Sequence, residues 1–312
     1  MIHVRVVSPP ATTDPVLALL SANSGVMNLI VTREAASNPD GDAVHFDVIT
    51  AEANAVLRGL RALEVDRLGS IVVENVDFEI SNRAAAAENR EPTISNVAPI
   101  WESAEATIRG LGHYAPSWFA LMVIAALIAT VGILTNSQIL IVGAMVVGPE
   151  YGAIINVAFG LHKRNRRRVV TGMRALVIGF GAAIIACLVF GLVVRAFDLQ
   201  PTAYSDGIRP VSTLIDEPNV FSVVVAVLAG VVGVVSLTEA RANTLIGVFV
   251  SVTTIPAAAD IGLSGAFGSW SEARGSAVQL LLNVGILIAV GAAGLKVQQR
   301  LWSRARLGLP RL

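Results

Sequence analysis

The sequence predicts an α-helical polytopic membrane protein with six transmembrane segments in a 3+3 inverted repeat, preceded by an N-terminal α+β ferredoxin-like domain. Three observations lead to this fold class. The 312 residues are 54% hydrophobic and only 15% charged, whereas soluble domains carry about 25% charged residues. Uncharged runs of the roughly 20 residues that cross a bilayer occur in the second half of the chain. Two of these runs share a proline at matching positions. The length of the uncharged runs excludes a wholly soluble protein.

The formal charges divide the chain into two parts of opposite sign. Residues 1–115 carry 8 Arg and 15 Asp or Glu, a net charge of −7, and residues 116–312 carry a net charge of +7. The negative charge of the first part argues against binding to nucleic acid. Cys187 is the single cysteine, which excludes a disulfide-stabilised secreted domain. Met1–Pro10 lacks the apolar core of a cleavable signal peptide.

Residues 1–80 are predicted to form the small domain, with the strand and helix order βαββαβ. The expected strands are His3–Val7, Gly25–Arg33, Val44–Thr50 and Ser70–Ile80, and the expected helices are Asp14–Ala22 and Ala51–Leu63. Asp14 is the predicted N-cap of the first helix, with Pro15 at its first position. The run Asn38-Pro39-Asp40-Gly41-Asp42 predicts a turn, with Asp40-Gly41 as the hairpin signal. The segment has no phosphate loop and no metal-ligand spacing, so no cofactor and no metal are expected.

Residues 81–115 are predicted to be a linker followed by an amphipathic helix at Pro99–Leu111. Trp101 and Ile108 lie on the apolar stripe of this helix, with charged residues opposite. Such a helix suits the membrane interface, and packing on the small domain is an equal alternative.

Residues 116–295 are predicted to form the transmembrane domain. Its six apolar runs are Ser117–Thr135, Ile139–Leu161, Val169–Val194, Val220–Leu237, Thr244–Ile261 and Ala277–Leu295. Five basic residues lie in the loop His162–Arg168, and the tail 296–312 adds five more without any acid. The loop Asp198–Pro218 carries four acids and one Arg. Because basic loops stay in the cytoplasm, both termini are expected to be cytoplasmic, in a bacterial inner membrane.

The second and fifth runs share a pattern that predicts the repeat. Asn136 precedes Pro149 by thirteen residues, and Asn243 precedes Pro256 by the same distance. The offset of 107 residues also relates the third run to the sixth, giving repeat 1 as 116–197 and repeat 2 as 219–295. Since each unit has three segments, the two units must have opposite orientations in the membrane. Matching Gly/Pro-interrupted segments in inverted repeats indicate a transport site, although two merely kinked helices would give the same spacing.

Two stretches of the sequence resemble a known family. They are ILIVGAMVVGPEYGAIINVAFGL at 139–161, with the basic loop after it, and ANTLIGVFVSVTTIPAAADIGL at 242–263. Over roughly residues 110–295 the chain is similar to the bacterial membrane proteins grouped as domain of unknown function 389. This resemblance implies an integral membrane protein and leaves the activity open.

The candidate substrate or ion site is predicted at the two prolines. A proline in a helix frees a backbone carbonyl, and in lipid that group needs a partner from protein, water or cargo. Glu150 is the only charged residue between Pro116 and Leu161, and a carboxylate within the membrane is a functional candidate. The alternative is a structural Glu150 held by Arg174 or Arg241. The expected site residues are Gly148, Pro149, Glu150, Thr253, Thr254, Pro256 and Asp260.

Asn136 and Asn243 are interpreted as helix caps, and Asp260 has an ordinary interfacial carboxylate as its alternative. Gly262-Leu263-Ser264-Gly265 matches the GxSG of intramembrane serine proteases, but that chemistry needs a base. All four histidines lie outside the apolar runs, so no enzyme is expected.

The sequence therefore predicts a permease or channel for a small solute or ion, which forms a homo-oligomer in the bilayer. The alternative is a membrane-anchored sensor or scaffold that transports nothing. In that case the small domain would bind a ligand or partner.

Overall fold

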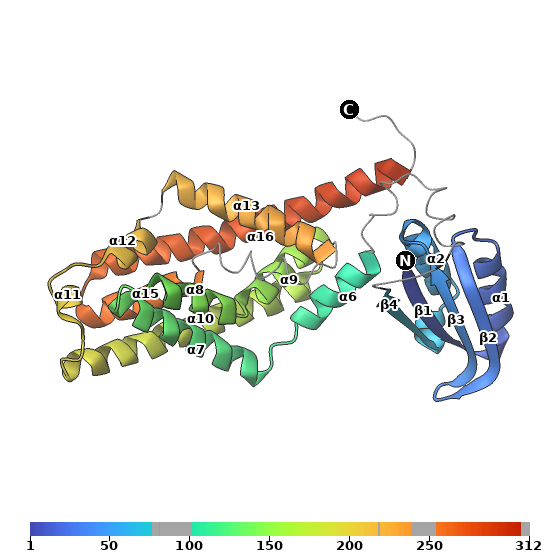
Figure 1. Cartoon of the computed structure of the whole chain (residues 1–312), viewed down its shortest axis with the longest axis horizontal. Helices are drawn as coiled ribbons and strands as arrows, with labels where there is room; N and C mark the ends of the chain where they lie inside the picture. The colour runs from blue at the N-terminus through green and yellow to red at the C-terminus, as the bar shows by residue number, and fades with distance from the viewer. Residues whose placement is uncertain (77–80, 82–100, 218, 239–253, 307–312) are drawn as a thin grey trace. The chain divides into compact units, whose positions relative to one another are not determined.

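The computed structural model describes residues 1–76, 81, 101–217, 219–238 and 254–306 of the chain, which divides into two compact units (Figure 1). The first unit contains Met1–Ala106, and the second contains Thr107–Leu237 and Arg241–Gln299. The first is built on a β-sheet, and the second is helical.

The first unit is a four-stranded antiparallel sheet with the strand order β2-β3-β1-β4. Its strands are β1 Ile2–Ser8, β2 Val26–Ser37, β3 Asp40–Val48 and β4 Ser70–Asn75. Its helices are α1 Pro10–Ser21, α2 Thr50–Ala62 and the short α3 Val65–Leu68. Alternate residues of β1 and β3 pack with apolar residues of α1 and α2 in one buried core. The element order matches the predicted βαββαβ, with α3 added.

The sequence predicted that the first helix begins at Asp14, but α1 begins at Pro10. Both positions have a proline that suits the first turn of a helix. The chain uses the earlier one, because there the Thr12 hydroxyl donates a hydrogen bond to the carbonyl oxygen of Pro9 at 3.0 Å. Asp14 therefore lies inside the helix, and its carboxylate receives a hydrogen bond from Arg33 at 2.7 Å.

The hairpin turn lies within the predicted Asn38–Asp42, but not at its Asp40-Gly41 pair. The loop is Asn38-Pro39, and Asp40 already pairs with Ser37 across the two strands. Gly41 is needed for a different reason, because a Cβ there would overlap the carbonyl oxygen of Ser8.

The second unit contains the membrane helices. In chain order its helices are α6 Trp101–Leu111, which begins in the first unit, α7 Pro116–Leu134, α8 Gln138–Val147, α9 Glu150–His162, α10 Arg166–Ala196, α11 Thr202–Ser205, α12 Pro210–Asp216, α13 Val220–Thr238, α15 Thr254–Phe267 and α16 Trp270–Arg306. The last turn of α6 packs on α9, where Leu111 lies against Gly152.

Four helices in the described part of the chain are long and apolar enough to cross a membrane: α7, α10, α13 and α16. Helices α8 and α9 pass the same test together, bent by 52° at a short break, and make a fifth candidate span. The protein is therefore a multi-pass membrane protein. Most of the predicted segment 244–261 lies outside the described residues, so six spans stay a prediction.

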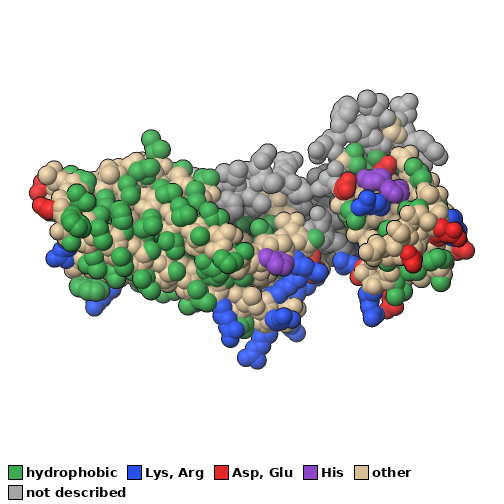
Figure 2. Space-filling model, turned by 90° about the horizontal axis from the view of Figure 1, so that it is seen from below, with side chains coloured by type: hydrophobic (Ala, Val, Ile, Leu, Met, Phe, Trp, Pro, Cys, Tyr) green, Lys and Arg blue, Asp and Glu red, His purple; other side chains and the backbone are tan. Residues whose placement is uncertain are grey.

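The outer surface of the helical unit is apolar. Large side chains such as Ile139 (84% exposed) and Phe221 (78% exposed) face outward, which suits contact with lipid. Figure 2 shows hydrophobic side chains over most of the visible face of this unit, with Lys and Arg gathered at one end. We call the end that holds the loop His162–Arg168 the basic end, and the end that holds α11 and α12 the α12 end.

Helices α9 and α15 run in opposite directions along α10. The start of α10 packs on α9. Gly172 of α10 contacts Val157 of α9, and Val169, three residues earlier in α10, contacts Gly160, three residues later in α9. These contacts are antiparallel. The second half of α10 packs on α15 in a parallel sense, because Gly262 meets Cys187 and Ala266 meets Gly191. In Figure 1 the two helices accordingly lie toward opposite ends of the unit.

Candidate functional site

The predicted break in the second apolar run is confirmed. Helix α8 ends at Val147 and α9 begins at Glu150, with Gly148-Pro149 between them. A residue before proline is pushed toward extended backbone, and Gly148 adopts φ −64° and ψ 127°.

Trp118 of α7 stabilises this break from the side. Its indole Nε1 donates a hydrogen bond to the carbonyl of Pro149 at 3.2 Å, which satisfies a backbone group that the break would leave unpaired. The same ring packs against Gly179, near the middle of α10. The break therefore lies midway along the longest neighbouring span.

The second half-helix starts at the same point. The hydroxyl of Thr254, the first residue of α15, donates to Glu150 Oε1 at 2.7 Å. Two helix amino ends, each carrying partial positive charge, thus meet at one carboxylate. The sequence placed the second start at Pro256, and the described part of α15 already includes Thr254, two residues before the buried Pro256. Thr253 lies outside the described residues.

The Glu150 carboxylate is buried, with 4% of the residue exposed. Oε1 is bonded to Thr254, whereas Oε2 has no hydrogen-bond partner within the described residues. The structural alternative needed an arginine partner, but Arg174 is exposed and Arg241 lies outside the described part of the chain. A buried carboxylate is costly unless it is paired, so this open oxygen is a position where a ligand is favoured.

Gly148 keeps space beside that oxygen. A Cβ at this position would overlap Glu150 Oε2 and lie 2.8 Å from Cγ1 of Ile255. A side chain at this position would therefore displace the Glu150 carboxylate or the Ile255 side chain.

Asp260 is buried. It is 0% exposed in α15, and its two oxygens accept three serine hydroxyls from three different helices. The donors are Ser212 of α12 at 2.8 Å, Ser276 of α16 at 2.6 Å and Ser264 of α15 at 3.3 Å. Asp260 thus lies in a polar centre toward the α12 end, away from Glu150 along α15.

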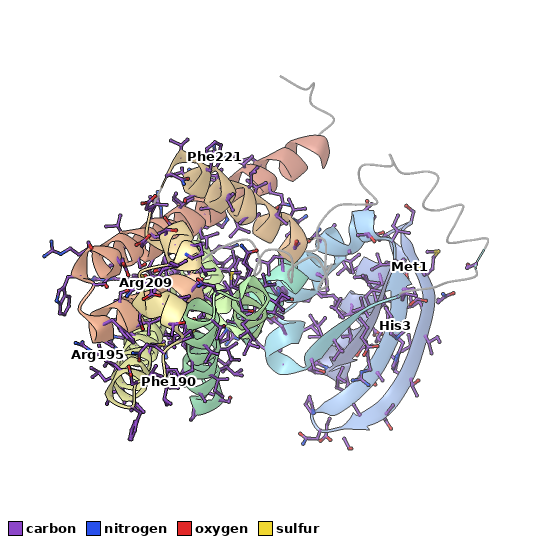
Figure 3. The ribbon with its side chains drawn as sticks, turned by 60° about the vertical axis from the view of Figure 1, so that its left-hand side comes forward. Met1, His3, Phe190, Arg195, Arg209 and Phe221 are labelled. Carbon is purple, nitrogen blue, oxygen red and sulfur yellow. The ribbon has the colours of Figure 1, made fainter. Side chains whose placement is uncertain are left out.

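An ion pair borders this centre. Arg209 donates to Glu272 at 2.8 Å and stacks over the ring of Tyr204 at 4.1 Å from its centroid. Arg209 and Arg195, both labelled in Figure 3, belong to the α12 end, and Arg195 bonds the carbonyl of Ala266. Beside them is Asp216, just outside the spans. Burial and the nearby carboxylates raise the pKa of Asp216 to about 6.

Sequence reasoning missed most of this centre. In the sequence, Ser264 was considered only as part of the GxSG pattern. In the structure, its hydroxyl hydrogen-bonds the carboxylates of Asp260 and Glu272. Ser276 and Gln279, which sequence reasoning did not single out, recur at helical spacing with Asn283, which it interpreted as an interhelical hydrogen-bonding group, and all three are buried in α16. Asn156 forms a hydrogen bond with Tyr114 at 3.1 Å.

The expected cap role of Asn136 is wrong. This residue has φ 50°, and its side chain donates to the carbonyl of Ile208 at 3.2 Å. The N-cap of α8 is Ser137, whose hydroxyl accepts from Leu140 N at 3.4 Å. Asn243, the second expected cap, lies outside the described residues.

Among the residues that the structure describes, no group of three His, Cys, Asp or Glu side chains could hold a metal ion.

One family model matches the chain, at residues 145–289, and it is described as "Domain of unknown function (DUF389)". No curated protein and no solved structure matches. The matched region includes the break at Pro149, the site at Glu150, Asp260 and most of α16. Over these residues the chain resembles the DUF389 family of membrane proteins.

Proposed function

We propose that this protein is a permease or channel for a small solute or ion, and not an enzyme. The observation that carries the proposal is the meeting of two half-helices at a buried carboxylate, halfway along α10. In transporters, broken helices whose amino ends meet near the bilayer midplane form substrate and ion sites. Glu150 and Thr254 line the site, and Gly148, Pro149 and Pro256 shape the backbone around it.

An inverted repeat accounts for this geometry. The predicted offset of 107 residues relates α7 to α13, α9 to α15 and α10 to α16. The opposite directions of α9 and α15 along α10 support it, because inverted units must place equivalent helices in opposite orientations. The basic end is cytoplasmic by the positive-inside rule, and the α12 end faces outward. Both termini are then cytoplasmic, in a bacterial inner membrane.

The site works by offering a passenger polar groups that lipid does not supply. Glu150 Oε2 provides a negative ligand at the break. The sheet unit is a cytoplasmic regulatory domain in this proposal, and the protein acts as a homo-oligomer.

The test is ion and solute flux in sealed vesicles that contain the purified protein. Currents on a solid-supported membrane are recorded for Na⁺, K⁺, H⁺ and Cl⁻ gradients, followed by small organic anions. Glu150→Gln should reduce the flux by about tenfold or more, because it removes the charge that binds the passenger. Asp206→Asn is the matched control, since Asp206 is exposed and its substitution also removes one negative charge.

Flux equal to that of protein-free vesicles for every probe would overturn the proposal. A membrane-anchored sensor or scaffold would then be the remaining function. Flux that Glu150→Gln leaves unchanged would overturn the assignment of the site.

A further inference from the structure

A row of buried polar side chains lies on one face of α16. Ser276, Gln279 and Asn283 are spaced by three and four residues, which places them on one face of a helix, and each is at most 3% exposed. Gln279 Nε2 donates to Asn283 Oδ1 at 3.3 Å. Gln279 Oε1 has no hydrogen-bond partner within the described residues. A buried amide oxygen without a donor is costly, so this atom points to a ligand.

This row extends from Asp260 to the level of Glu150. At its start, Ser276 donates to Asp260 Oδ2 at 2.6 Å. Further along, Gly291 of α16 packs on Ala158 of α9, eight residues after Glu150. Asn283 precedes Gly291 by the same eight residues, or about 12 Å at 1.5 Å per residue.

Both helices run toward the basic end, where His162 of α9 lies 2.9 Å from Gln299 of α16. Equal distances along two helices that run the same way place Asn283 at the depth of Glu150. The polar row on α16 therefore extends from Asp260 to the depth of the site of the proposed function.

The other end of the row reaches the surface. Ser264 hydrogen-bonds both Asp260 and Glu272, at 3.3 Å each. The side chain of Glu272 is 29% exposed. A polar series thus runs from the surface at the α12 end to the interior. By contrast, the neighbouring faces of α10 and α15 meet through glycine, alanine and leucine.

The charges along this series select for positive ions. The acidic groups that face one another are Asp216, Asp260 and Glu272, and Arg209 is the cation paired with them, on Glu272. Tyr204 is the other titratable side chain at this centre. Asp260 is surrounded by neutral hydroxyl donors, so one added positive charge balances it, as one also balances Glu150.

We propose that Asp260, Ser276, Gln279 and Asn283 form a binding route for a small monovalent cation, an alkali metal ion or a proton, from the α12 end to Glu150. The route rests on the proposed function for its destination, but cation binding at Asp260 does not require that transport occurs. Asp260 binds the cation, and the oxygen of Gln279 replaces part of its hydration on the way inward.

Binding is tested on the purified full-length protein in detergent. Its unfolding temperature is measured in NaCl, LiCl and KCl against choline chloride at equal ionic strength, since a ligand of the folded state raises that temperature. Proton uptake is tested separately in vesicles that contain a pH-sensitive dye, under an imposed potential. The variants are Asp260→Asn and Gln279→Met, and Asp206→Asn is the control. Gln279→Met keeps side-chain length and removes the amide, so it remains informative if Asp260→Asn fails to fold.

We expect one alkali ion to raise the unfolding temperature of the unmodified protein, or protons to enter the vesicles. Both variants should lose that effect by about tenfold or more in apparent affinity or rate, and the control should keep it. Asp260-dependent binding of an alkali ion without any flux would support the route and overturn the proposed function. Flux that neither variant changes would overturn the route and leave the proposed function standing. The route is also overturned if no alkali ion shifts the unfolding temperature and no protons enter.

Discussion

The two half-helices α9 and α15 start at the same carboxylate and differ in what surrounds them. Helix α9 is buried over Glu150–Gly160 among apolar groups, and its one buried amide, Asn156, is paired with Tyr114. Helix α15 is equally buried but carries Asp260 and Ser264. The α15 half therefore contains a polar centre, and the α9 half is an ordinary apolar interface.

This difference shows how two segments with one shared pattern can take separate roles. Both begin near a proline and both pack on α10, so their backbones satisfy similar constraints. The polar groups are concentrated on the side of α15, α12 and α16, where the access route to Glu150 is proposed. The apolar α9 half closes the opposite side.

The largest effect expected is a loss of stability when a glycine is replaced where α15 or α9 packs on α10. A Cβ at Gly262 of α15 would lie 2.5 Å from the carbonyl oxygen of Ile184 and 2.8 Å from Leu188 N, both backbone atoms. A Cβ at Gly172 of α10 would mainly meet a side-chain methyl of Val157, which can shift. Gly262→Ala should therefore lower the free energy of unfolding by about 3 kcal/mol, and Gly172→Ala by about 1 kcal/mol.

These variants are compared by thermal unfolding in detergent, with Gly181→Ala as the control. Gly181 lies on α10 with no atom within 4 Å of its added Cβ, so this substitution should be neutral or slightly stabilising. Equal losses for Gly262→Ala and Gly172→Ala would show that the two halves pack alike.

A smaller effect is expected at the break where the halves meet. Trp118→Phe keeps an aromatic ring against Gly179 but removes the hydrogen bond to the carbonyl of Pro149. The free energy of unfolding should fall by about 1 kcal/mol. Trp270→Phe, at a residue that is 67% exposed, is the control and should change little. No difference between the two variants would mean that the break needs no partner from α7.

The smallest effect is a pH dependence at the α12 end. Because burial and then Asp260 and Glu272 raise the pKa of Asp216 to about 6, the folded protein binds this proton more tightly than the unfolded chain. The charged form costs stability above about pH 6, and the cost disappears as the pH falls toward the ordinary pKa of 3.8.

Asp216→Asn should therefore be more stable than the unmodified protein at neutral pH, with the difference vanishing in acid. Unfolding temperatures from pH 4 to pH 8 measure it, with exposed Asp206→Asn as the control. A difference that is constant over this range would contradict the raised pKa.

Several features followed from the sequence alone because they depend on local pattern. Alternating apolar residues and turn residues predicted the order of strands and helices in the sheet unit. Long uncharged runs predicted the spans, because crossing a bilayer requires them. The chemistry of Gly148-Pro149 predicted the break, since a proline deep inside an apolar run removes a backbone hydrogen bond and disfavours helix at the residue before it.

Only the tertiary structure decided which groups meet. Glu150 and Thr254 are 104 residues apart and bond because α9 and α15 both start midway along α10. Asp260 is near the end of its apolar run, which suggested an interfacial carboxylate, yet α12 and α16 bury it by supplying hydroxyl donors. Burial and pairing depend on the packing of distant segments, and no local pattern contains that information.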